Sequence, residues 1–202
     1  MALPLGVALP LAFLLGSIPF GLLLVRILTG QDLRKVGSGN IGATNASRAF
    51  GEKARLPVFV LIYLLDASKG LVPTLFFLAP GSPLGARVLV GLVAILGHCF
   101  SPFLGFKGGK GVATTSGVLL ALDWPAFLVG ILAFFVVFGI TRVVALGSLA
   151  LGLGLALGII FEDPTRAFGE RLPLTSLGLF LALFLFWTHR SNLRKLLAAR
   201  RA

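Results

Sequence analysis

The chain has 202 residues, 57% of them hydrophobic and only 12% charged, with a mean hydropathy of +1.01. Soluble domains are about 45–50% apolar and about 25% charged, so the composition excludes an ordinary soluble protein and predicts an all-α integral membrane protein embedded in the lipid bilayer. The formal net charge of +11 is better explained by basic loops at a cytoplasmic membrane face, facing anionic lipid or an anionic substrate, than by nucleic acid, and we expect no nucleic-acid partner.

Seven apolar segments are candidate membrane spans, since a helix needs about 20 apolar residues to cross the hydrocarbon. Pro19 predicts a kink in the first segment. The fourth holds only 11 residues, about 16 Å at 1.5 Å per residue, so it either crosses a locally thin region or re-enters the membrane. In chain order the segments are residues 3–28, 56–79, 88–104, 112–122, 126–140, 143–161 and 172–187.

The distribution of Lys and Arg decides between six and seven crossings. With seven crossings and the N-terminus outside, only Arg87, Arg166 and Arg171 face outward, which obeys the positive-inside rule, whereas six crossings would lose the bias. We therefore expect seven transmembrane helices, one of them short, a cytoplasmic C-terminus and one transmembrane domain over residues 1–202. The cytoplasmic cations would be Arg26, Arg34, Lys35, Arg48, Lys53, Arg55, Lys107, Lys110, Arg142, Arg190, Arg194, Lys195, Arg200 and Arg201.

The first polar segment, residues 37–48, reads GSGNIGATNASR. Its glycine spacing is not a dinucleotide fingerprint, because no strand precedes it. Glycines nevertheless let backbone N–H groups approach an anion, a following helix would present its positive end, and Arg48 offers a fork suited to phosphate. The segment predicts an anion site, with a flexible interfacial turn as the alternative. The residues assigned to the site are Gly37, Ser38, Gly39, Asn40, Thr44, Asn45 and Arg48.

The second polar segment, residues 105–115, reads GFKGGKGVATT. It is not a Walker A loop, because Gly111 stands where Ser or Thr would follow the lysine. A glycine-rich loop with two cations before a helix start at Val112 is a plausible phosphate cradle, and the positive-inside rule explains its lysines but not its glycines. Two such loops indicate one substrate with two phosphates or two phosphorylated substrates. The residues assigned here are Lys107, Gly108, Gly109, Lys110 and Gly111.

Two further segments are polar near the expected cytoplasmic face. In residues 141–148, Arg142 is equally well read as an interfacial anchor, and the hydroxyl of Ser148 either bonds its own helix or faces a site. In the tail, His189 and Asn192 are three residues apart and share a helix face. A basic amphipathic anchor on anionic lipid is the alternative for the tail.

Three ionisable residues fall inside predicted spans. Asp66 and Lys69 are three residues apart, so they can neutralise each other on one helix face, either to brace the loops or to take part in catalysis. His98, near the inner end of its span, is typical of a packed helix-end histidine. Cys99 is the only cysteine, which excludes a disulfide and a cysteine metal cluster within the chain; we read it as a small buried hydrophobe and expect no metal or cofactor.

Five motifs in order along the chain resemble the acyl-phosphate:glycerol-3-phosphate acyltransferases (PlsY family). They are SIPFG at residues 17–21, GSGNIGATN at 37–45, DASKG at 66–70, Gly97-His98 with FKGGKGVAT at 106–114, and His189 with Asn192. The sequence departs from the family in having Ala145 with Ser148 in place of paired serines, and in lacking the Gly-x-Glu tail at residues 199–201.

The resemblance implies a seven-span enzyme of the bacterial inner membrane with its active site on the cytoplasmic side. It would move a fatty acyl group from acyl phosphate to the 1-position of glycerol 3-phosphate, giving lysophosphatidate and phosphate, the first committed step of phospholipid synthesis. By motif position, the resemblance implies that the binding and catalytic set is Ser38, Arg48, Lys110, Ser148, His189 and Asn192.

The residues themselves agree with such chemistry, since two phosphorylated substrates would occupy two cradles and an activated donor needs positioning and charge neutralisation rather than a triad. A transporter of a phosphorylated solute is the main alternative, although the largely apolar residues 71–84 disfavour a polar path to the outer face. A non-catalytic membrane anchor would leave the glycines unexplained.

Overall fold

The computed structural model describes residues 2–199, and over that range it is helical, without a β-strand. Six helical segments are long and apolar enough to span a membrane: Leu5–Thr29, Glu52–Phe76, Leu84–Leu104, Trp124–Thr141, Val144–Glu162 and Leu172–Ala199. A seventh apolar helix, Val112–Leu122, is shorter. The structure therefore confirms the predicted all-α membrane fold with one short helix.

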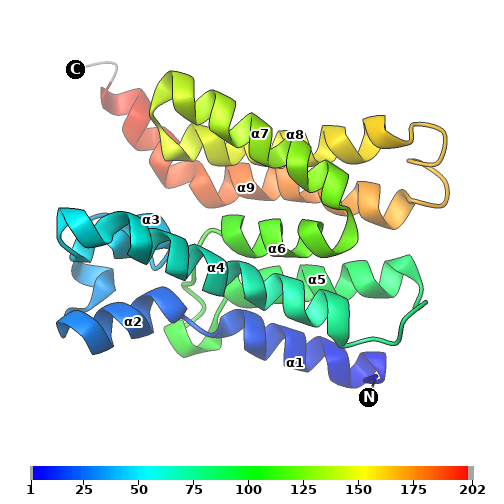
Figure 1. Ribbon diagram of the computed structural model, residues 1–202, viewed down its shortest axis with the longest axis horizontal. Coiled ribbons are helices and arrows are strands. Elements are labelled where there is room, and N and C mark those ends of the chain that lie inside the picture. The colour runs from blue at the N-terminus through cyan, green and yellow to red at the C-terminus, as the bar shows by residue number, and fades with distance from the viewer. Residues whose placement is uncertain (1, 200–202) are drawn as a thin grey trace. The chain divides into compact units, whose positions relative to one another are not determined.

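The helices bear the labels of Figure 1. The α-helices are α1 (Leu5–Ser17), α2 (Phe20–Thr29), α3 (Ala43–Ala46), α4 (Glu52–Phe76), α5 (Leu84–Cys99), α6 (Val112–Leu122), α7 (Trp124–Thr141), α8 (Val144–Glu162) and α9 (Leu172–Ala199). Three short 3-10 turns complete the described part: η1 (Leu33–Lys35), η2 (Ser47–Ala49) and η3 (Pro102–Leu104). The last span continues beyond residue 187, the end expected from the sequence, because most of the basic tail is part of the same helix. Arg200 and Arg201 lie outside the described residues.

The chain divides into two compact units. Unit 1 comprises Met1–Ser82 and Leu89–Val118, and unit 2 comprises Pro83–Val88 and Leu119–Ala202. Both units are assembled from two separate stretches of sequence, so the division does not by itself define two independently folding domains. The single domain over residues 1–202 therefore stays a prediction.

In unit 1 the first span is broken at Pro19, as the sequence predicts. Figure 1 shows α1 and α2 following one another, with α4 beside both. The break takes the carbonyls of Ser17 and Ile18 out of the regular helical hydrogen-bond pattern, because Ile18 is extended. Side chains from neighbouring segments bind them: Lys69 Nζ donates to the Ile18 carbonyl at 2.8 Å, and Ser101 Oγ donates to the Ser17 carbonyl at 2.7 Å.

Glycines allow helices of unit 1 to approach closely. A Cβ on Gly16 would overlap the carbonyl oxygen of Ala94 on α5, and one on Gly97 would overlap the carbonyl oxygen of Phe13 on α1. A Cβ on Gly117 of α6 would likewise overlap a carbonyl oxygen of α4. Small residues at helix crossings are typical of membrane proteins, where van der Waals contact rather than the hydrophobic effect drives helices together.

In unit 2, α7, α8 and α9 lie side by side (Figure 1), and α8 contacts both of the others. Gly152 of α8 lies against Ala182 and Leu185 of α9, whereas Gly178 of α9 lies against Ala156 of α8. Higher numbers on one helix thus meet lower numbers on the other, so the two helices are antiparallel. This register brings the start of α8 to the level of residues near 189 on α9.

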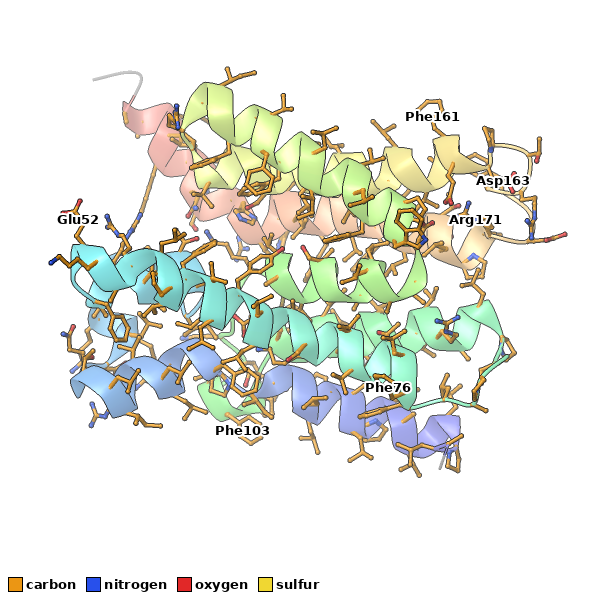
Figure 2. The ribbon with its side chains drawn as sticks, in the orientation of Figure 1. Glu52, Phe76, Phe103, Phe161, Asp163 and Arg171 are labelled. Atoms are coloured by element: carbon orange, nitrogen blue, oxygen red, sulfur yellow. The ribbon has the colours of Figure 1, made fainter. Side chains whose placement is uncertain are left out.

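Large apolar side chains cover the outside of the helices. Phe76, Phe103 and Phe161 point away from the ribbon in Figure 2, and their exposed fractions are 69%, 61% and 72%. A water-soluble protein seldom exposes so much contiguous apolar surface, whereas hydrocarbon solvates it without cost. The exposed faces therefore fit a chain that spans the bilayer.

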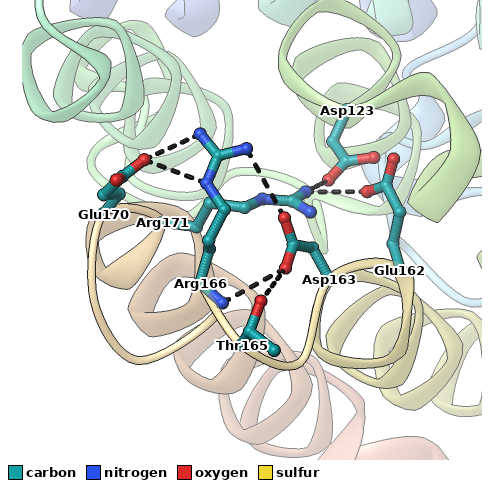
Figure 3. A network of polar contacts seen from close by, with 7 residues as sticks. All are labelled: Asp123, Glu162, Asp163, Thr165, Arg166, Glu170 and Arg171. Carbon is teal, nitrogen blue, oxygen red and sulfur yellow. Dashed lines mark hydrogen bonds and ion pairs between the residues drawn. The ribbon is translucent and has the colours of Figure 1, made fainter.

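A polar network closes the end of unit 2 where α8 turns into α9 (Figure 3). Asp123 accepts a hydrogen bond from the Ala126 N–H at 3.0 Å and so caps α7. Arg171 pairs with Asp123 and, at 2.8 Å, with Glu162. The network ties the start of α7 to the α8–α9 connection; its residues are Asp123, Glu162, Asp163, Thr165, Arg166, Glu170 and Arg171.

Candidate functional site

The first glycine-rich segment forms a loop that is organised by Asn45. Gly37 and Gly39 adopt φ angles of +53° and +72°, which favour glycine. The buried Asn45 amide accepts a hydrogen bond from the Ser38 N–H at 2.9 Å and donates one to the Asn40 carbonyl at 2.9 Å. All of its hydrogen bonds are made within this region, so Asn45 shapes the loop that presents Ser38.

Ser38 and Arg48 are both exposed, and Thr44 is half-buried. The Cδ atom of Arg48 lies 3.7 Å from the point where Gly37 would carry a Cβ, so the Arg48 side chain runs beside the loop. The four-residue helix α3 and the turn η2 follow the loop directly, before the long helix α4. So short a helix as α3 contributes little dipole to an anion site. Positive charge at this loop comes from Arg48.

The second glycine-rich loop is fastened to the end of α5. The N–H groups of Gly108 and Gly109 donate to the carbonyls of Cys99 and His98, both at 3.0 Å. These two amides are therefore occupied within the protein, and the assignment of Gly108 and Gly109 to a phosphate site stays a prediction. Gly111 has a φ of +85° and leads into α6, which begins at Val112 as predicted.

The start of α6 and the lysines of this loop remain suited to an anion. Among the described residues, the N–H groups of Gly111 and Val112 have no hydrogen-bond partner, as expected at a helix start. Lys107 is exposed and Lys110 is half-buried. Backbone amides at a helix N-terminus together with two cations form a setting in which phosphate is stabilised.

One apolar cluster brings the two loops to the same part of unit 1. Ile41, Ala43 and Ala46 of the first loop are buried in it. Leu104, which immediately precedes the second loop, packs against the same cluster. A Cβ on Gly21 of α2 would overlap the Ile41 carbonyl oxygen, so α2 also fixes the first loop. Both predicted anion loops are therefore held by a shared core.

Three ionisable side chains form a buried group behind the second loop. Lys69 Nζ lies 2.7 Å from Asp66 Oδ1 and 2.9 Å from His98 Nδ1. The side chains of Asp66 and Lys69 are only 4% and 1% exposed. The structure confirms that Asp66 and Lys69 neutralise each other and that His98 is a packed residue at a helix end.

The remaining candidates lie in unit 2. Ser148 is buried near the start of α8, and its Oγ donates to the Val144 carbonyl at 2.9 Å. His189 is buried in α9, and its Nδ1 donates a hydrogen bond to the Leu185 carbonyl at 2.9 Å. The register of α8 and α9 places Ser148 and His189 at the same level, and Asn192 follows on α9.

The family model for glycerol-3-phosphate acyltransferases matches residues 6–199. The chain belongs to the glycerol-3-phosphate acyltransferase family. A glycerol-3-phosphate acyltransferase of Anaeromyxobacter dehalogenans is 44% identical over 188 residues, covering 91% of this chain and 89% of the relative. One from Myxococcus xanthus is 45% identical and covers 92% of each chain.

Solved structures agree with this assignment to the acyltransferase family. The crystal structure of PlsY, an integral membrane glycerol 3-phosphate acyltransferase, in its glycerol 3-phosphate form matches with a TM-score of 0.84 and 34% identity. The alignment covers 97% of this chain and 93% of that one. Its lysophosphatidic acid form matches with a TM-score of 0.82 and 32% identity.

Within this acyltransferase, the sequence-predicted residues fall into two groups. Ser38, Arg48 and Lys110 belong to unit 1, whereas Ser148 and His189, with Asn192, belong to unit 2. Sequence reasoning gave His98 no part in the site, although the Gly97-His98 pair stands among the family motifs. The signal that identifies it is spatial, because the link from His98 to Lys69 joins residues 29 positions apart.

Proposed function

We propose that the protein transfers a fatty acyl group from an acyl phosphate to the 1-hydroxyl of glycerol 3-phosphate, which yields lysophosphatidate and inorganic phosphate and begins phospholipid synthesis. Family membership and the glycerol 3-phosphate and lysophosphatidic acid forms of the related crystal structures support the acceptor and the product. The structural observation that carries the proposal is the pair of basic, glycine-rich loops on one apolar cluster of unit 1. Two substrates that each carry a phosphate match two such loops.

The acyl donor is proposed from two features of the chain: a catalytic motif that is missing and basic residues that are present. The H-x-x-x-x-D pair of many glycerolipid acyltransferases is missing, since Phe103 and Arg194 stand five residues after the two histidines. An acyl phosphate already carries a good leaving group, so the enzyme needs to position it and to neutralise charge rather than to generate a strong nucleophile. Arg48 and Lys110 supply that neutralisation in our proposal.

The transfer balances without an enzyme-bound acyl group. The 1-hydroxyl oxygen of glycerol 3-phosphate attacks the acyl carbonyl carbon, and the bond from that carbon to the phosphate oxygen breaks with its electron pair on the phosphate. A substrate phosphate takes the hydroxyl proton. The Nδ1 of His189 donates to the Leu185 carbonyl, which fixes the orientation of the ring, and we propose that His189 helps to bind substrate rather than to take the hydroxyl proton.

The decisive experiment gives the purified protein glycerol 3-phosphate with either acyl phosphate or acyl-CoA and measures lysophosphatidate. We expect product from acyl phosphate alone and a sequential kinetic pattern. Equal use of acyl-CoA would contradict the proposed donor. A labelled acyl group trapped on Ser38, Ser148 or Cys99 in the absence of acceptor, together with ping-pong kinetics, would contradict direct transfer.

We also propose that the protein lies in the bacterial inner membrane with both loops and the tail on the cytoplasmic side. The bias of Lys and Arg supports this orientation. Single cysteines at the exposed positions Ser38, Lys107 and Lys195, in a Cys99→Ala background, should resist an impermeant thiol reagent in spheroplasts and react after lysis. A cysteine at Gly81 is the matched control on the other side and should react before lysis. The opposite pattern would reverse the orientation.

A further inference from the structure

Lys69 reaches the centre of unit 1 and has three acceptors around its ammonium group. They are Asp66 Oδ1 at 2.7 Å, the Ile18 carbonyl at 2.8 Å and His98 Nδ1 at 2.9 Å. The ring of Phe20 lies 5.5 Å from Nζ. An ammonium group has three protons and no lone pair, so all three contacts are donations from Lys69. The ammonium group is therefore fully satisfied without water.

This arrangement fixes the state of the His98 ring. Because Nδ1 accepts a hydrogen bond from Lys69, Nδ1 carries no proton of its own, and the neutral ring has its proton on Nε2. Asp66 Oδ1 is 3.9 Å from Nδ1, beyond hydrogen-bond length, so the carboxylate acts on the ring through Lys69. The ring has one orientation and one tautomer.

The opposite edge of that ring faces the second glycine-rich loop. A Cβ on Gly109 would overlap Nε2 of His98, so only glycine fits between the ring and the loop. The N–H groups of Gly109 and Gly108 bind the last carbonyls of α5, which hold the backbone against the ring. Gly109 has no positive φ, so its need for glycine comes from the ring rather than from backbone strain.

We propose that His98 is a positioning residue of this acyltransferase: held by Lys69 and Asp66, its ring sets the path of residues 105–111 and so the placement of Lys107 and Lys110. The inference rests on the proposed function, in which these lysines bind a substrate phosphate. The loop is otherwise rich in glycine, and such a backbone has little stiffness of its own. A rigid buried ring beneath Gly109 supplies that stiffness.

The test is a double-mutant cycle between residues 98 and 109. Gly109→Ala introduces a methyl group where the ring lies. His98→Asn keeps an acceptor for Lys69 at the place of Nδ1 but removes the ring edge that the methyl group would meet. Purified Gly109→Ala, His98→Asn and the double variant are compared with the parent by kcat and by the KM of both substrates.

We expect Gly109→Ala to raise the KM of one phosphorylated substrate at least tenfold, because the loop is displaced. In the double variant this KM should return to within about threefold of the His98→Asn value. Gly108→Ala is the matched control, since its Cβ would overlap the main-chain oxygen of residue 98, which no side-chain change removes. His98→Asn should leave the Gly108→Ala defect unrelieved.

The proposal is overturned if the double variant is as defective as Gly109→Ala, or if His98→Asn relieves Gly108→Ala equally. A fall in kcat with both KM values unchanged would also overturn it, because that pattern reports fewer folded molecules rather than a displaced loop. If the parent makes no lysophosphatidate from acyl phosphate, the proposed function fails by itself. The melting temperatures of the same variants then test the contact between residues 98 and 109. Gly109→Ala should lower the melting temperature, and adding His98→Asn should reverse that decrease.

Discussion

Each unit contains a buried carboxylate that is neutralised by a basic side chain, but the surroundings of the two groups differ. In unit 1, Asp66 and Lys69 lie within a membrane span and are at most 4% exposed. In unit 2, Asp123 is equally buried, but its partner Arg171 is 16% exposed and also contacts Glu162, which is 36% exposed. The group in unit 1 is almost fully enclosed by protein, whereas the group in unit 2 lies at a helix connection and is partly exposed.

The contrast indicates that the role of an ion pair depends on where it lies in the protein. The group in unit 2 caps α7 and joins it to the α8–α9 connection, which is a task of stability (Figure 3). The group in unit 1 binds a carbonyl freed by the break at Pro19 and orients the ring beneath the second loop. We expect substitutions in the group of unit 1 to affect both folding and substrate binding. Substitutions in the group of unit 2 should affect folding alone.

Lys69→Met should have the largest effect on stability. It leaves Asp66 as an uncompensated buried charge, which typically costs about 3–5 kcal/mol. The free energy of unfolding, measured by titrating the purified protein from mild detergent into SDS, should fall by about that amount. Combining Lys69→Met with Asp66→Asn removes the stranded charge and should restore part of the loss. If the double variant were the less stable of the two, the pair would not neutralise itself as described.

Arg48→Ala and Lys110→Ala should come next, through activity rather than folding. Each removes a charge-assisted phosphate contact, and we expect kcat/KM to fall about 100-fold or more, equivalent to about 2.7 kcal/mol. Lys195→Ala, which removes an exposed cation from the tail, is the control and should change kcat/KM less than about twofold. Equal and mild effects at all three positions would favour an anchor that binds anionic lipid.

Arg171→Met should have a smaller effect and spare catalysis. It leaves Asp123 without its main partner at a site that water partly reaches, so we expect a loss of about 1–3 kcal/mol in the free energy of unfolding. The activity of each folded molecule should not change. Arg166→Met, which breaks a pair exposed by 57% and 75%, should cost less than about 1 kcal/mol. A drop in kcat/KM for Arg171→Met would contradict the proposal that the ionic group of unit 2 serves stability alone.

The smallest effect should be the acid dependence contributed by surface carboxylates. Hydrogen bonds from the Arg34 side chain, and then from its backbone, lower the pKa of Asp32 to about 2. A lowered folded-state pKa favours the charged form, so the stabilisation is present above the ordinary value of 3.8 and disappears as pH falls toward 2. In unit 2, the Thr165 hydroxyl lowers the pKa of Asp163 in the same direction.

Asp32→Asn tests this dependence. The melting temperature of the variant should lie slightly below that of the parent at about pH 5 and meet it as the pH approaches 2. Asp163→Asn should behave alike, because both carboxylates are on the surface. A gap that widens on acidification would contradict the assigned direction of the pKa shift.

Much of the fold follows from the sequence because a bilayer imposes a simple length and polarity rule. The spans, the interruption at Pro19 and the short helix beginning at Val112 were all predictable from apolar run length and proline chemistry. The pairing of Asp66 with Lys69 followed from their spacing of three residues on a helix. These features depend on local sequence or on one solvent rule.

The parts that the sequence did not predict depend on contacts between distant segments. Gly108 and Gly109 were assigned to a phosphate site, but the sequence could not show that their N–H groups bind α5. Asn45 was assigned to the anion site, but the sequence could not show that its side-chain amide bonds the main chain of residues 36, 38 and 40. Spacing cannot reveal which carbonyl a loop amide meets, and neither can it show that His98 would stand between Lys69 and Gly109.

The close crossing of α1 and α5 has a consequence for protein engineering. Replacing a helical glycine with alanine commonly raises the free energy of unfolding by about 0.4–1 kcal/mol. Helix propensity alone would therefore favour this change throughout the helices of this glycine-rich chain. At Gly16 and Gly97 the added methyl group would meet a carbonyl oxygen and drive the helices apart. Gly6 and Gly139 have open space around the same atom. A thermostabilised variant for inhibitor screening should therefore be sought at these two open positions, with the helix crossing left untouched.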